Sequence, residues 1–163
     1  MKRRNPAIPL CRGAIISALY VALTYLASLV GLASGVIQLR LSEALTILPV
    51  MMPEAIPGLF VGCLISNLLV PGAHPLDIIF GSIATLIGAI GAYLLRKLPK
   101  KFIFCATIPT ILSNAIIIPF VLKFAYGADG SYPYFMLTVG IGEIISAGIF
   151  GVFLYYSIRK MKF

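Results

Sequence analysis

The sequence predicts an all-α polytopic membrane protein, a bundle of six transmembrane helices, on the basis of composition and charge pattern. Apolar residues make up 60% of the 163 residues and charged residues only 11%, whereas a soluble domain carries roughly 25% charged residues. A chain of this length cannot bury so much apolar surface inside itself, so most of that surface must face lipid. The basic residues also gather in clusters between long apolar runs, which is typical of membrane proteins.

The first apolar run, which extends from Ala14 to Ala33, predicts a first span at about 13–33. The basic start of the chain could be mistaken for a signal peptide. This run of about 20 residues is longer than the ~7–15 residues of a secretory apolar core. We therefore expect the run to be retained as a membrane span.

The next apolar run, 44–70, is expected to form two short spans, at about 40–52 and 55–70. The run contains Pro49, Pro53, Glu54 and Pro57. Proline disfavours helix at the residue before it, and a carboxylate is costly in the middle of a bilayer. Residues 52–54 are therefore predicted to turn near the cytoplasmic surface.

The basic clusters independently require this division, because they are expected on one side of the membrane. Two clusters on the same side require an even number of crossings between them. With one span in 44–70 the chain would cross three times between the first two clusters, whereas with two spans it crosses four times. A nucleic-acid interface is disfavoured, since the clusters build no continuous face. The clusters are Lys2, Arg3, Arg4 and Arg12; Arg96, Lys97, Lys100 and Lys101; and Arg159, Lys160 and Lys162.

Three further apolar runs predict spans at about 76–96, 102–123 and 134–158. The chain is then a single transmembrane domain, 1–163, with both termini in the cytoplasm. The outer connections are expected at 34–39, 71–75 and 124–133. The last of these is rich in Gly and Pro and carries no positive charge, as expected of an outer loop.

Polar and ionisable residues within the apolar runs are candidates for substrate binding, because such groups are costly at membrane depth. In the predicted topology all of them lie in the outer half of the bundle. This distribution favours a pocket that opens to the outside over an ion path through the whole membrane. The candidates are Arg40, Glu43, Asn67, Asp77, Asn114 and Glu143.

Each candidate also has a structural interpretation. Arg40 and Glu43 are three residues apart and could pair on one helix. Asp77 could cap its helix, and the two asparagines could form hydrogen bonds between helices. Glu143 has no cation close in sequence, and a buried carboxylate without a partner should be neutral or bound to a ligand, so a binding role is favoured there. His74 and Lys123 are expected to be solvated near the outer rim.

Small residues recur at helical spacing in two of the predicted spans. Ala14, Ala18 and Ala22 line one face of the first span, either for internal packing or as a docking face for another membrane protein. Gly58 and Gly62 have the same spacing in the third span. Such stripes allow two helices to approach closely.

The sequence contains no motif for catalysis or for a cofactor. It has no phosphate-binding loop, no nucleophile elbow and no zinc-protease motif. The three cysteines, Cys11, Cys63 and Cys105, have no metal-ligand spacing and are expected to be small core residues. The chain is therefore not expected to be an enzyme or to hold a cofactor or a metal. A transporter of this kind would use an ion gradient or a separate motor.

Three segments carry a resemblance to a known family. They are QLRLSEALTILP at 38–49, AIPGLFVGCLISN at 55–67 and DIIFGSIATL at 77–86. The sequence resembles the S components of energy-coupling factor (ECF) transporters, most closely the queuosine-precursor group called QueT. The stripe of Ala14, Ala18 and Ala22 is similar to the motif with which S components contact their membrane partner.

The resemblance implies a vitamin importer of the bacterial plasma membrane. An S component binds its substrate at the outer face and associates with a transmembrane T component and two ATPase subunits. The implied substrate is a 7-deazaguanine, such as 7-aminomethyl-7-deazaguanine or queuine. Its donor edge and its amine would each suit a carboxylate, so we expect Glu43 and Glu143 to bind them, in an order left open, with amides and Arg40 completing the lining.

Three other functions remain open from the sequence. The chain could be an S component for another vitamin, such as a flavin or thiamine. It could be a proton-coupled carrier with Glu143 as the proton site. It could also be an assembly subunit without a ligand, whose polar residues only join helices.

Overall fold

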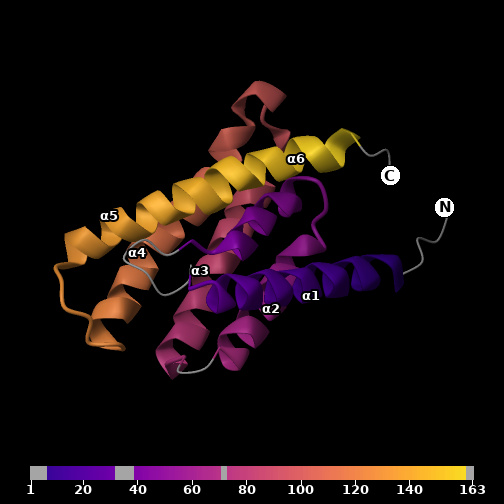
Figure 1. Ribbon diagram of the computed structural model, residues 1–163. Coiled ribbons are helices and arrows are strands. Elements are labelled where there is room, and N and C mark those ends of the chain that lie inside the picture. Colours follow the sequence, from indigo (N-terminus) through magenta and orange to yellow (C-terminus); the bar gives the residue numbers. More distant parts are fainter. Residues whose placement is uncertain (1–6, 32–38, 71–72, 161–163) are drawn as a thin grey trace.

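The computed structural model describes residues 7–31, 39–70 and 73–160, and the regular structure in these ranges is helical (Figure 1). Four basic residues (Lys2, Arg3, Arg4 and Lys162), Gln38, the end of the first predicted span, residues 34–38 of the first predicted connection and residues 71–72 of the second lie outside the described residues. The elements are α1 (Ala7–Leu29), η1 (Leu41–Val50), α2 (Ala55–Leu69), α3 (Pro75–Leu94), η2 (Leu95–Lys97), η3 (Lys100–Thr107), α4 (Ile108–Phe124), α5 (Tyr132–Glu143), η4 (Ile144–Phe150) and α6 (Gly151–Lys160).

The helices form a polytopic membrane bundle. Within the described residues, four helical segments are long and apolar enough to cross a bilayer: Ala7–Leu29, Pro75–Lys97, Lys100–Phe124 and Tyr132–Lys160. The helices at Leu41–Val50 and Ala55–Leu69 are apolar but shorter. This confirms the predicted all-α membrane class, while the number of crossings stays a prediction.

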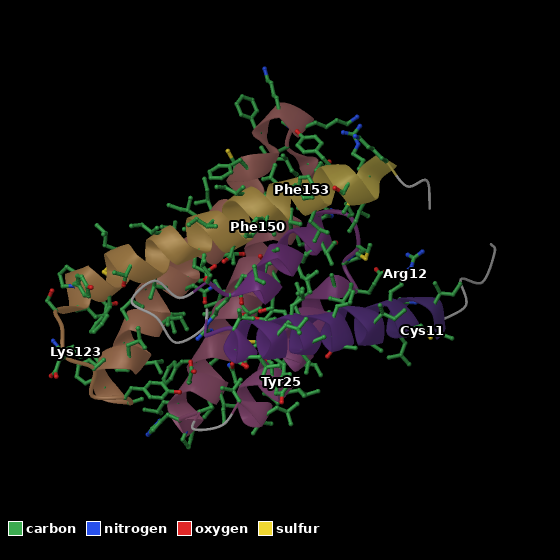
Figure 2. All side chains as sticks on the ribbon, viewed as in Figure 1. Cys11, Arg12, Tyr25, Lys123, Phe150 and Phe153 are labelled. Atoms are coloured by element: carbon green, nitrogen blue, oxygen red, sulfur yellow. The ribbon has the colours of Figure 1, made fainter. Side chains whose placement is uncertain are left out.

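The surface of the bundle is apolar and part of its interior is polar. Leu10 and Phe153 are 75% and 72% exposed, whereas Glu43 is completely buried. Labelled side chains such as Phe150 and Phe153 stand on the surface of the long C-terminal helical segment (Figure 2). Since apolar side chains are stable on the outside only where they face lipid, this arrangement fits a membrane solvent.

The start of α1 and the end of α6 lie at the same end of the bundle, which we call the terminal end (Figure 1). Arg12 pairs there with Glu54 of the turn between η1 and α2, at 3.1 Å. At the same end, the Tyr156 hydroxyl donates to the Lys100 carbonyl oxygen at 3.2 Å. Lys123 lies at the other end, far from Arg12 (Figure 2); we call this the opposite end.

The helix ends differ from the predicted boundaries where polar residues or bends occur. α1 begins at Ala7 and not near residue 13, because Arg12 is helical and faces Glu54 instead of ending the helix. The segment predicted at 102–123 begins at Lys100 and bends at Phe102. The segment predicted at 134–158 runs from Tyr132 to Lys160 and contains the π-helical turns of η4.

Close packing of α1 on α2 depends on the glycine pair in α2. A Cβ at Gly58 would lie 2.5 Å from the Gly13 carbonyl oxygen, and one at Gly62 would lie 2.8 Å from Tyr20 Cβ. The predicted packing role of these glycines is thus confirmed. The close approach brings Tyr20 of α1 toward the interior, where it is buried.

Candidate functional site

Glu43 lies at the centre of the polar interior, in the first turn of η1. The Tyr20 hydroxyl of α1 and the Thr85 hydroxyl of α3 both donate to its Oε1, the latter at 3.1 Å. Its Oε2 is buried and has no hydrogen-bond partner. One oxygen of this carboxyl group is therefore held by two other elements, α1 and α3, and the other is free to accept a bond from a ligand.

Asn114 and Glu143 complete this centre from α4 and α5. Asn114 is fully buried and Glu143 is 2% exposed. The amide of Asn114 lies beside both carboxyl groups, which also act electrostatically on each other. Nevertheless the Asn114 nitrogen and oxygen and Glu143 Oε2 form no hydrogen bond. We call Tyr20, Glu43, Thr85, Asn114 and Glu143 the buried polar cluster.

Such unpaired groups are unusual, because nearly all buried polar atoms in folded proteins have partners. Glu143 is the last residue of α5 and directly precedes η4, and π-helical turns occur frequently at functional sites. Ser146 of η4 is also fully buried with an unpaired hydroxyl oxygen. The site therefore presents several unsatisfied donors and acceptors to a bound molecule.

The other three predicted residues gather at the opposite end. Arg40 lies 3.7 Å from Asp77 Oδ1, at ion-pair distance, although no hydrogen bond reaches that oxygen. Asn67 donates to the Asp77 carbonyl oxygen at 3.3 Å. The pairing of Arg40 with Glu43, one of the structural interpretations, is not found, because Arg40 pairs with the carboxylate of α3 and Glu43 accepts hydroxyl groups instead.

Cys63 of α2 links these two groups. Its sulfur lies 3.4 Å from the Thr85 hydroxyl oxygen and 3.6 Å from Asn67 Nδ2. The six candidate residues thus belong to one connected region. The expectation of a buried core position is correct for Cys63 but wrong for Cys11, which is exposed, because α1 starts before it and turns that side chain outward.

Two residues at the opposite end form contacts that the sequence did not predict. His74 is not simply solvated, since its Nδ1 accepts from the Leu76 N–H at 3.2 Å and caps α3. Asp77 is therefore not the cap. Instead its Oδ2 accepts from the Tyr126 hydroxyl at 3.2 Å, and that hydroxyl accepts from the His74 N–H at 2.9 Å. Partial burial raises the pKa of Tyr126, so its hydroxyl stays protonated and can donate.

Sequence reasoning missed Tyr20, Thr85 and Tyr126. A signal for Tyr20 exists: Tyr20 and Thr24 are four residues apart, on a face of α1 different from that of the alanine stripe, and Thr24 donates to the Ser42 hydroxyl at 2.9 Å. Thr85 and Tyr126 carry no comparable pattern. Their roles depend on contacts with residues that are distant in the sequence.

The alanine stripe borders an open groove on the outer surface of α1 and α2. The groove has a volume of about 930 Å³. Ala14, Ala18 and Ala22 are exposed along it, and Gly58 and Val61 form part of the facing side. The stripe therefore does not serve internal packing, which the glycines of α2 provide from the other helix.

A lipid-exposed helical bundle with unpaired carboxyl and amide groups in its interior is typical of membrane transporters. The chain belongs to the QueT transporter family, whose family model matches residues 10–160. It is 31% identical over 158 residues to the queuosine precursor transporter QueT of Lactococcus lactis subsp. cremoris, covering 90% of this chain and 89% of the relative. No solved structure is significantly similar to the chain. The protein is a multi-pass membrane transporter and not an enzyme.

Proposed function

We propose that the chain is the substrate-binding subunit of an ECF importer and that it binds a 7-deazaguanine such as 7-aminomethyl-7-deazaguanine or queuine. The observation that carries the proposal is the set of unpaired buried atoms on Glu43, Asn114 and Glu143. The name of the Lactococcus relative, a queuosine precursor transporter, supports this substrate class.

The chemistry of the cluster suits such a ligand. A guanine-like edge presents adjacent N–H donors, which carboxylate oxygens accept in charge-assisted bonds. The ring carbonyl needs a donor, which the Asn114 amide or Arg40 can supply. An aminomethyl group is cationic and needs a second carboxylate. Glu43 and Glu143 therefore bind the donor edge and the amine, and Asn67, Asp77 and Arg40 close the site at the opposite end.

We further propose that the chain crosses the membrane six times, with both termini in the cytoplasm. The helix start at Ala7 and the helix end at Lys160 lie at the same end of the bundle (Figure 1). Basic residues of all three clusters that the structure describes, among them Arg12 and Lys100, lie at this same end. The positive-inside rule then places the opposite end, with Arg40 and Asp77, at the outer face.

The partners in this proposal are a transmembrane T component and two ATPase subunits. The exposed stripe of Ala14, Ala18 and Ala22 supports docking of another helix, because small side chains allow close approach in lipid. The sequence has no ATP-binding motif, so in this proposal the energy of ATP hydrolysis comes from the partner subunits.

The substrate proposal is tested by mass spectrometry of small molecules that remain bound to the natively purified chain. A deazapurine is expected, and a flavin or thiamine would redirect the assignment to another vitamin. Uptake is then measured in cells with and without the T component and the ATPases. Uptake that needs only a pH gradient would establish a proton-coupled carrier in place of an ECF subunit.

A further inference from the structure

The polar interior has more acidic than basic groups. Arg40 is the cation that acts on both carboxyl groups of the buried polar cluster, and it is already paired with Asp77 at 3.7 Å. Glu43 and Glu143 are left with one unpartnered oxygen each, in positions that are almost fully buried. Two buried carboxylates that repel each other are very unfavourable without a compensating cation.

Among the described residues, the other titratable groups nearby supply no further cation. Tyr20 of α1 and Cys63 of α2 lie near Glu43 and are neutral, and Asp77 of α3, which acts on Arg40, is acidic. α4 contributes the neutral amide of Asn114. That amide is suited to a half-protonated pair, since its nitrogen can donate to a carboxylate while its oxygen accepts from a carboxylic acid.

Each carboxyl group has one unpartnered oxygen, but the hydroxyl donors gather on Glu43, which favours Glu143 as the group that carries the proton. Glu43 Oε1 accepts from two hydroxyl groups, and such donors favour the ionised form. Glu143 Oε2 has no donor. We propose that the ligand-free site holds one proton on Glu143, beside the amide of Asn114, and that a cationic substrate displaces this proton when it binds. This inference rests on the proposed function, because it assigns the protonated amine of the substrate to Glu143.

The exchange balances in charge and atoms. The proton leaves the carboxyl oxygen for the solution as the ammonium group of the ligand takes its place beside the carboxylate. Because protons and ligand compete, affinity falls as pH falls, by up to about tenfold per pH unit where the empty site is protonated and the bound site is not. A neutral ligand cannot drive the exchange and binds more weakly.

The test is isothermal titration calorimetry of the full chain in detergent, in two buffers of different ionisation enthalpy. Two probes are compared: 7-aminomethyl-7-deazaguanine, which is a cation, and 7-cyano-7-deazaguanine, which has the same ring but a neutral substituent. We expect about one proton to be released with the cation and none with the nitrile. Glu143→Gln should bind the cation more weakly and release no proton, while Glu54→Gln, at the terminal end, should behave like the unaltered chain.

The outcomes separate this inference from the proposed function. If the cation binds tightly without releasing a proton, or if Glu143→Gln releases as many protons as the unaltered chain, proton displacement is overturned and deazaguanine binding stands. Equal affinity for the nitrile at every pH would also overturn it. If neither probe binds, the proposed substrate class fails, and the inference fails with it.

Discussion

At the scale of single residues, the site combines one carboxyl group that the protein holds in place with one that it leaves unpaired. Glu43 is oriented by Tyr20 and Thr85, which come from two other helices. Glu143 Oε2 and both amide atoms of the Asn114 side chain are buried and form no hydrogen bond. Burying such groups opposes folding, so their presence supports the proposal that they bind a ligand.

Replacement of either carboxyl group should weaken substrate binding. Glu43→Gln and Glu143→Gln each remove one charge-assisted bond, which contributes about 1.5–3 kcal/mol and so more than about tenfold in affinity. The measurement is equilibrium binding of 7-aminomethyl-7-deazaguanine to purified protein. Glu54→Gln, which alters a carboxylate paired with Arg12 at the terminal end, is the control and should bind normally. Unchanged affinity in both of the first two variants would refute the assigned site.

At the scale of elements, the contact of α1 with α2 positions Tyr20 against Glu43. The Cβ of Gly58→Ala would lie 2.5 Å from the Gly13 carbonyl oxygen, so α1 would have to move away. We expect a loss of about 1–3 kcal/mol and a fall of several degrees in the melting temperature in detergent.

Gly140→Ala in α5 is the matched control for Gly58→Ala. Its Cβ would meet only Ala115 Cβ, at 3.8 Å, and alanine is the better helix former by about 1 kcal/mol. This variant should be as stable as the unaltered chain or more stable. If Gly58→Ala melted no lower than Gly140→Ala, α1 and α2 would not be closely packed at this point.

The connection between α4 and α5 is attached to the start of α3 by the Tyr126 hydroxyl. Tyr126→Phe removes its bonds to Asp77 and His74 but keeps the edge contact of the ring with His74. Each lost bond is worth about 0.5–1.5 kcal/mol, so we expect the substrate to dissociate severalfold faster in stopped-flow measurements. Tyr134→Phe removes a hydroxyl that forms no hydrogen bond with the described part of the chain, on an exposed ring, and should leave the rate unchanged. Equal rates in both variants would show that this attachment does not control exchange.

At the scale of the whole molecule, the groove on α1 and α2 is separate from the buried polar cluster, although both use α1. Ala18→Leu would fill part of the groove and disturb a docked helix by about 1–3 kcal/mol. Uptake in cells should fall roughly tenfold or more, whereas substrate binding to the isolated chain should be unchanged. Leu19→Phe, on an exposed part of α1 outside the groove, should affect neither. A loss of binding together with uptake would argue against a docking role.

The two ends of the bundle should face opposite sides of the membrane. Lys101→Cys and Asp129→Cys, both at exposed positions, are made in a chain in which Cys11 and Cys105 are replaced by alanine. A membrane-impermeant maleimide added to intact cells should label the second variant at once and the first only after permeabilisation. Labelling of both from outside would rule out the proposed orientation.

The sequence by itself determined the membrane class, because 60% apolar and 11% charged residues leave lipid as the only suitable solvent. It also placed the turn at 52–54, within an apolar run that three prolines and a carboxylate interrupt, and it identified Glu43, Asn114 and Glu143 among the polar residues of the interior. These features follow from local composition and spacing. The sequence could also name the QueT family, since the resemblance covers nearly the whole chain.

Only the tertiary structure decided which polar groups meet. Arg40 pairs with Asp77, 37 positions further along the chain, and not with its near neighbour Glu43. Tyr20 and Thr85 share one oxygen of Glu43 although they lie on different helices. Local spacing cannot specify such contacts, because they depend on how closely whole helices approach one another. Here that approach is set by glycines such as Gly58, where even one added carbon atom would push two backbones apart.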